Sequence, residues 1–134
     1  MRQILHIAIL FFAFSPLHSA AETSPIYTKV TAEQILEMQK MQSGLVVIDV
    51  RSEQQAATGM IKGAINLPVY HFNNEALAQH IPAKDTPIIL YCNDLTCGAS
   101  ALAASKAYKM GYINLYKYPQ GIADWMDKGL PTNQ

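Results

Sequence analysis

The chain has 134 residues, of which 50% are hydrophobic and 15% are charged, with 10 basic and 10 acidic side chains. This length suits one domain with a sizeable hydrophobic core. The balanced charge argues against a nucleic acid or an anionic membrane as a partner, because neither would be attracted electrostatically.

The first 21 residues are predicted to be a secretory signal peptide. Arg2 gives a positive start, a mostly apolar run covers residues 4–14, and small residues at 19–21 precede a cleavage site at Glu22. This pattern is typical of signal peptides, and the run is shorter than the roughly 20 apolar residues of a membrane span. We therefore expect export to the periplasm or the medium, one domain over residues 22–134, and no membrane span after cleavage.

Predicted strands and helices alternate after this segment. Thr31 is the expected N-cap of the first helix, with Gln34 completing a capping box, and Gly44 is its expected end. The predicted strands are 26–30, 45–50, 64–68, 88–91 and 113–117, and the predicted helices are 32–43, 53–58, 75–80, 99–110 and 122–128. This alternation predicts an α/β fold, in which helices cover both faces of a mostly parallel five-stranded sheet.

Cys92 follows the predicted buried strand 88–91 and shortly precedes the helix 99–110. In an open α/β sheet, ligands bind at the carboxyl ends of the strands. A helix N-terminus attracts anions and favours a thiolate over a thiol. Cys92 is therefore a candidate nucleophile. Tyr91 points to the opposite face of the sheet, where we expect it to pack.

Cys97 is the second cysteine of the chain and lies five residues after Cys92. In an oxidising compartment, two nearby cysteines often pair. A disulfide bond between them is thus an alternative to a free nucleophile.

Several segments of the predicted domain share the order and spacing of one known family. They are 47–51, Glu53, 59–68, Tyr91-Cys92 with the Ala-rich helix after it, Gly111-Tyr112, and Gly121 with Trp125. Together they resemble the rhodanese family of sulfurtransferases over nearly all of residues 22–134.

The resemblance implies an activity. In that family a cysteine accepts a sulfane sulfur from a donor such as thiosulfate, becomes a persulfide, and passes the sulfur to cyanide or a thiol. Carried over to this chain, Cys92 is the nucleophile. The backbone N–H groups of the loop would then hold negative charge; this cradle is Asn93, Asp94, Leu95, Thr96, Cys97, Gly98 and Ala99. No metal and no organic cofactor is implied, and the expected partners are a small sulfur-containing donor and a thiol or cyanide acceptor.

The loop departs from the family pattern at two positions. Many active rhodaneses have a glycine three residues after the cysteine and an arginine five residues after it, where this chain has Leu95 and Cys97. A guanidinium holds an oxyanion through two hydrogen bonds. Its absence is expected to weaken thiosulfate binding by about 1.5–3 kcal/mol for each lost charge-assisted bond. Lys62 is a candidate replacement, and a persulfide or polysulfide is the alternative donor.

Besides simple sulfur transfer by Cys92, the presence of Cys97 leaves two interpretations open. As a resolving thiol, it would attack a Cys92 persulfide and close a disulfide, which makes the chain a redox protein with a redox partner protein. As half of a permanent bridge, it would leave the loop inert. The alternative without any enzymatic activity is a degenerate rhodanese-like binding module. A related phosphatase is disfavoured, because Gly98 stands six residues after Cys92, where such an enzyme needs arginine.

Three charged residues and two histidines complete the set of candidates. Asp49 and Arg51 are expected to form a structural charge pair, with Glu53 as a further member, because buried charges are normally paired. His71 and His80 are expected at the surface, because neither has a metal-ligand spacing to a cysteine.

Overall fold

The computed structural model describes residues 24–133 and has an α/β fold built on one parallel sheet. Its five strands lie in the order β1-β6-β5-β2-β4, and each neighbouring pair is parallel. The predicted fold class and the predicted five-stranded sheet are therefore confirmed. The predicted signal peptide, residues 1–21, lies outside the described residues.

Helices and short loops connect the strands. The strands of the main sheet are β1 (Thr28–Lys29), β2 (Val46–Asp49), β4 (Ile65–Asn66), β5 (Ile88–Tyr91) and β6 (Leu115–Tyr118). The helices are α1 (Ala32–Met41), α2 (Glu53–Ala56), the 3₁₀ helix η1 (Val69–His71), α3 (Asn74–His80), α4 (Ala99–Lys109) and α5 (Gly121–Asp127). A small antiparallel pair joins β3 (Met60–Ile61) to β7 (Thr132–Asn133). The sequence does not predict β3, β7 or η1, because two or three residues are too few to show a period.

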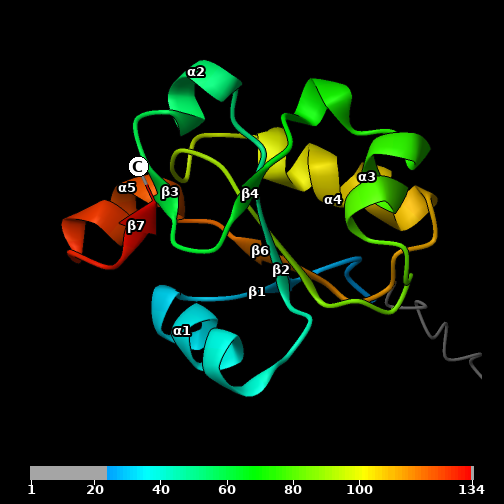
Figure 1. The fold of residues 1–134 in the computed structure, drawn as a ribbon, viewed down its shortest axis with the longest axis horizontal. Helices are drawn as coiled ribbons and strands as arrows, with labels where there is room; N and C mark the ends of the chain where they lie inside the picture. Colours follow the sequence, from blue (N-terminus) through cyan, green and yellow to red (C-terminus); the bar gives the residue numbers. More distant parts are fainter. Residues whose placement is uncertain (1–23, 134) are drawn as a thin grey trace, which may run out of the picture.

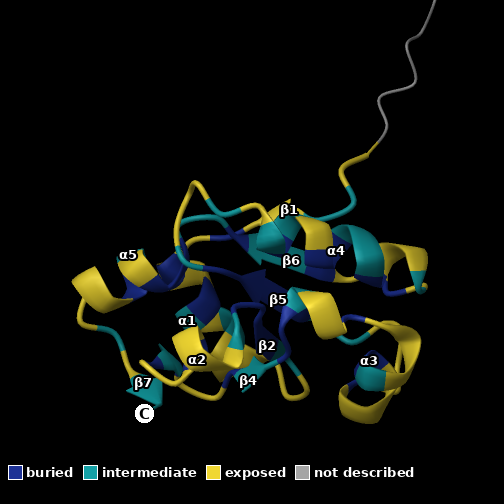
Figure 2. Ribbon diagram, turned by 90° about the horizontal axis from the view of Figure 1, so that it is seen from above, coloured by how far each residue is buried: buried dark blue, intermediate teal, exposed yellow. Residues whose placement is uncertain are grey.

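The side chains of β5 alternate between two hydrophobic cores, one on each face of the sheet. Ile88 and Leu90 pack in the core that contains α3 and α4 residues, and Ile89 and Tyr91 pack in the core that contains α1 and α5 residues. Figures 1 and 2 show the helices on both sides of the buried strands. Cys92 belongs to the α4 core, so the strand directs its side chain away from the side that Tyr91 occupies.

Side-chain caps fix two helix starts. Thr31 Oγ1 accepts from Gln34 N at 3.3 Å, and Gln34 Oε1 accepts from Thr31 N at 2.9 Å, which confirms the predicted capping box of α1. Ser52 and Gln55 form a similar box at α2, directly after Arg51. Among residues 24–133, no helix combines the length and apolar character needed to cross a bilayer.

Candidate functional site

A disulfide bond between Cys92 and Cys97 closes the loop from β5 to α4. The two Cα atoms are 6.2 Å apart, a separation that a disulfide spans without backbone movement. The Cys92 side chain is 4% exposed, and Cys97 is half-buried. Since both sulfurs are bonded, Cys92 can act as a nucleophile only after this bond is reduced.

Hydrogen bonds that involve no sulfur atom also hold the loop. The Asp94 carboxylate accepts from Thr96 N at 2.9 Å and from Thr96 Oγ1 at 2.7 Å, and Cys97 N donates to Asp94 O at 3.2 Å. The bond from the Thr96 hydroxyl, followed by that from its N–H, lowers the pKa of Asp94 below its ordinary value. The turn therefore carries a fixed negative charge.

This turn changes the expected anion cradle at two positions. The N–H groups of Thr96 and Cys97 donate to Asp94 and not toward an external anion. The cradle predicted over residues 93–99 is thus corrected for the oxidised loop, because an Asp side chain readily captures the N–H two residues later. Gly98 is the N-cap of α4 and supplies no capping side chain. The positive end of the α4 helix dipole faces the loop.

The start of α5 anchors the first half of the loop. Ile122 N donates to Cys92 O and Ala123 N donates to Asn93 O, both at 3.0 Å. Gly121 has φ +66°, and a Cβ at this position would lie 2.5 Å from Cys92 O. Only glycine fits here. In the sequence, Gly121 belongs to the segments that carry the family resemblance, but its close approach to the loop is visible only in the structure.

Acidic side chains surround the open side of the loop. A pocket of about 280 Å³ is lined by Asp94, Leu95, Thr96, Gln120, Asp124 and Asp127. Its lining holds three carboxylates and no cation. The nearby Lys128 bonds instead to Glu33 at 3.0 Å and to Asp124 at 3.2 Å. An approaching dianion therefore meets negative charge.

Lys62 lies at the amino ends of the strands, and the loop lies at their carboxyl ends. Lys62 precedes β4, whereas Cys92 follows the carboxyl end of β5. It lines a different pocket, between α1 and Trp125, where Gln39 Nε2 donates to Lys62 O at 3.0 Å. In this structure Lys62 does not replace the missing loop arginine.

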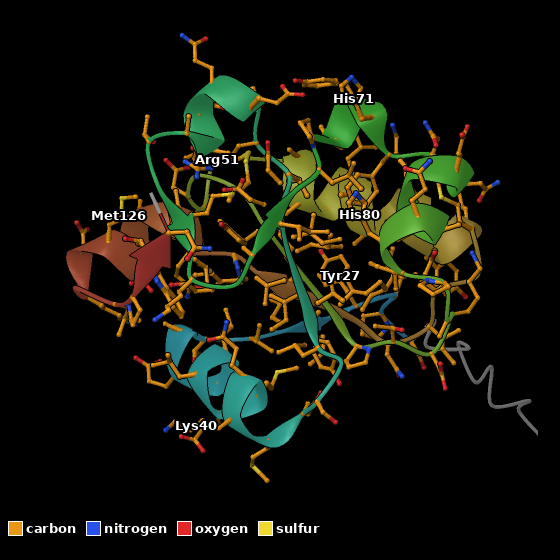
Figure 3. The ribbon with its side chains drawn as sticks, in the orientation of Figure 1. Tyr27, Lys40, Arg51, His71, His80 and Met126 are labelled. Atoms are coloured by element: carbon orange, nitrogen blue, oxygen red, sulfur yellow. A yellow bond between two sulfur atoms is a disulfide. The ribbon has the colours of Figure 1, made fainter. Side chains whose placement is uncertain are left out.

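Arg51, the single arginine within residues 24–133, forms a buried ion pair. Its Nη2 atom lies 2.6 Å from Asp49 Oδ2 and donates to Gly59 O at 2.6 Å. Tyr91 Oη donates to Asp49 Oδ2 at 2.9 Å and accepts from Ile61 N at 3.0 Å. Figure 3 shows Arg51 directed between α2 and β3. The guanidinium is thus occupied by structural partners.

Tyr91 does more than the packing expected of it. Burial, and then the charge of Asp49, raise the pKa of Tyr91 far above its ordinary value of 10.0. The phenol therefore stays protonated and serves as a hydrogen-bond donor to the ion pair.

Glu53 does not join the buried pair, which corrects the predicted set of three charges. It is the first residue of α2, and its exposed carboxylate accepts from Tyr70 Oη and lies 3.6 Å from His71 Nδ1. The hydrogen bond from Tyr70 lowers the pKa of Glu53. His71 and His80 are exposed, and Figure 3 shows His71 at the rim beside α2. Within the described part of the chain, no three metal-ligating side chains are grouped around a common point.

Comparisons with known proteins agree on one family. A family model described as a rhodanese-like domain matches residues 31–128. The thiosulfate sulfurtransferase GlpE of Pseudomonas putida (strain GB-1) is 31% identical over 101 residues, which cover 74% of this chain and 84% of that protein.

Solved structures share the fold. A protein from Bacillus halodurans has 24% identity and a TM-score of 0.70, covering 81% of this chain and 77% of that one. A rhodanese-related protein from Thermoplasma volcanium has 23% identity and a TM-score of 0.60, covering 80% of this chain and 98% of that one.

Proposed function

Because the chain belongs to the rhodanese-like domain family, we propose that it is a sulfurtransferase that carries a sulfane sulfur as a persulfide on Cys92. The observation that carries this proposal is the place of Cys92, directly after the central strand β5 and in the loop that leads to the N-terminus of α4. Its curated relatives include thiosulfate sulfurtransferases.

The reaction begins with the reduced loop. The Cys92 thiolate attacks the sulfane sulfur of the donor, and the bond between that sulfur and the rest of the donor breaks. The leaving group departs with the bonding electron pair, and Cys92 holds the sulfur as a persulfide. A thiol or cyanide then attacks the outer sulfur and releases Cys92 as a thiolate. The N-terminus of α4 favours the thiolate at both ends of this cycle.

The charge around the loop favours a persulfide or polysulfide over thiosulfate as donor. Thiosulfate and its sulfite leaving group need cationic or N–H partners for their oxygens. Here Arg51 is bound to Asp49, the N–H groups of Thr96 and Cys97 donate to Asp94, and the adjacent pocket is acidic. A persulfide or polysulfide has no sulfonate oxygens, so it does not need these partners.

Thiocyanate formation from cyanide tests this proposal. The measurement uses reduced Cys97→Ser protein, which cannot close the bridge, and compares thiosulfate with inorganic polysulfide. With polysulfide, we expect a rate above that of Cys92→Ser protein. We expect the kcat/KM for thiosulfate to be lower than that for polysulfide by about tenfold or more, as one missing charge-assisted bond implies. Rates equal to those of Cys92→Ser with both donors would contradict the proposal.

Export remains part of the proposed function and rests on the sequence of residues 1–21. The Cys92–Cys97 bond supports it, because disulfides persist in oxidising compartments. The intact mass of protein recovered from a periplasmic or extracellular fraction tests it. A chain that starts at Glu22 is expected, and a full-length chain confined to the cytoplasm would contradict export.

A further inference from the structure

Cys97 is held within reach of the Cys92 sulfur by the loop itself. The Asp94–Thr96 turn and the bond from Cys97 N to Asp94 O bring residue 97 back toward the end of β5. The carbonyls of Cys92 and Asn93 are fixed at the same time by α5. None of these bonds involves a sulfur atom, so reduction of the disulfide breaks none of them. Reaction between groups held in this way has a high effective concentration.

We propose that the reduced protein has a further activity, the reduction of a sulfane sulfur to hydrosulfide, in which Cys97 resolves the persulfide on Cys92. This step rests on the sulfur loading of Cys92 proposed above. The Cys97 thiolate attacks the Cys92 sulfur, and the bond between Cys92 and the transferred sulfur breaks. The transferred sulfur takes the bonding pair and one proton and leaves as hydrosulfide. Two cysteine sulfurs are oxidised to the disulfide, and the sulfane sulfur is reduced by two electrons.

The disulfide in the structure is the product of that step. In it the two Cα atoms are 6.2 Å apart, within the range that a disulfide spans. Cys97 also stands directly before the N-cap of α4, where the helix dipole favours its thiolate. The structure therefore supplies the geometry required of a resolving thiol.

The two sulfurs differ in access, which assigns them different partners. Cys92 is 4% exposed and packs in the α4 core, so only a small donor can reach it. Cys97 is more open, and its neighbour Leu95 is 73% exposed. A dithiol reductant attacks the more accessible sulfur. It forms a mixed disulfide on Cys97, expels Cys92 as the thiolate, and then releases Cys97 with its own second thiol.

A single-turnover experiment tests this activity. The reduced wild-type protein is freed of reductant under anaerobic conditions and mixed with one equivalent of inorganic polysulfide. Hydrosulfide and intact mass are measured together, with Cys97→Ser, Cys92→Ser and untreated wild-type protein as controls. We expect wild type to lose about two hydrogens (~2 Da) and to release about one hydrosulfide per chain more than Cys97→Ser does. Cys97→Ser should keep one added sulfur (~32 Da) and release only the remainder of the donor.

The outcomes separate the two proposals. A wild-type protein that keeps a stable added sulfur, as Cys97→Ser does, would overturn the resolving role of Cys97 and leave the sulfurtransferase intact. If Cys97→Ser gains no sulfur, the loading of Cys92 fails and the resolution step fails with it. Dithiothreitol provides the last arm: repeated additions with excess polysulfide should give further hydrosulfide from wild type above both single variants. Equal yields from all three proteins would count against a catalytic cycle.

Discussion

Two neighbouring strands of the sheet end in turns of opposite character. Residues Asp49 and Tyr91 are paired in register at the ends of β2 and β5. After β2, Arg51 turns back into the protein and is held by Asp49 and Gly59. After β5, the chain forms an acidic, partly open loop that is closed by a disulfide between Cys92 and Cys97.

The difference separates a structural turn from a chemical one. The turn after β2 buries two opposite charges and satisfies them with hydrogen bonds, so its polar groups are not available to a substrate. The loop after β5 holds its shape through backbone bonds and one turn, and leaves two sulfurs in a bond that thiols can exchange. The arginine of the described chain thus stabilises the fold, and the proposed sulfur chemistry is assigned to the cysteines.

Removal of the Arg51 side chain should have the largest effect on stability. Arg51→Met leaves the buried Asp49 carboxylate without its charged partner, which costs about 3–5 kcal/mol in the free energy of unfolding. Urea denaturation measures this cost. Lys40→Met is the matched control, because Lys40 bonds to Glu37 at 3.1 Å on the surface and Figure 3 shows Lys40 at the edge of the molecule. It should cost about 0–1 kcal/mol.

The same variant tests the division of roles between the turns. Folded Arg51→Met protein should still load sulfur on Cys92, because the guanidinium contacts Asp49 and Gly59. Loss of loading from protein that is still folded would show that Arg51 acts on the donor, and the contrast between the two turns would fail.

A side chain at Gly121 should disturb the loop after β5, because it would meet the backbone of Cys92 and Asn93. In Gly121→Ala, the positive φ costs about 1–2 kcal/mol, and the Cβ, 2.5 Å from Cys92 O, adds about 1–3 kcal/mol of overpacking. Gly129→Ala separates the two terms, because Gly129 has φ +64° with nothing within 4 Å of its Cβ. Thermal denaturation and sulfur loading of Cys92 are measured for both. Equal losses in the two variants would mean that α5 does not position the loop.

Reduction of the Cys92–Cys97 bond should have a modest effect on stability. The bond closes a loop of sequence separation 5, and chain entropy assigns such a short loop about 2 kcal/mol. Urea denaturation with and without dithiothreitol measures the difference. A protein that unfolds upon reduction would identify the bridge as an essential structural element.

Asp94 provides the smallest and most local prediction. Its pKa is lowered by Thr96, so its contribution to stability is present above the ordinary Asp range and is lost as the pH falls through the lowered value. Carboxyl chemical shifts from NMR should give a midpoint below the ordinary value of 3.8, and Thr96→Ala should raise it. An unchanged midpoint in that variant would show that the Thr96 hydroxyl does not lower the pKa of Asp94.

Local sequence signals predict the sheet and the position of Cys92 well. The apolar run before Cys92 and the Ala-rich segment after it fix the strand, the loop and the helix, and alternation along β5 places Tyr91 opposite Cys92. These features depend on residues that are close in sequence.

Contacts between distant segments are the part that the sequence does not predict. The bond from Tyr91 to Asp49 joins residues 42 positions apart, and the close approach of Gly121 to Cys92 O joins residues 29 positions apart. The pairing of Cys92 with Cys97 is left open by the sequence, because spacing alone does not determine whether two thiols bond. Glu53 is misplaced for a similar reason, since a cap at Ser52 turns it outward at the start of α2.

The intact masses of the two single-cysteine variants test directly whether Cys92 carries the sulfur. Reduced Cys97→Ser retains only Cys92, and reduced Cys92→Ser retains only Cys97. After brief exposure to inorganic polysulfide and removal of the excess, we expect a stable gain of one sulfur (~32 Da) in Cys97→Ser and a smaller gain in Cys92→Ser. An equal gain in both variants, or a gain only in Cys92→Ser, would contradict Cys92 as the sulfur carrier.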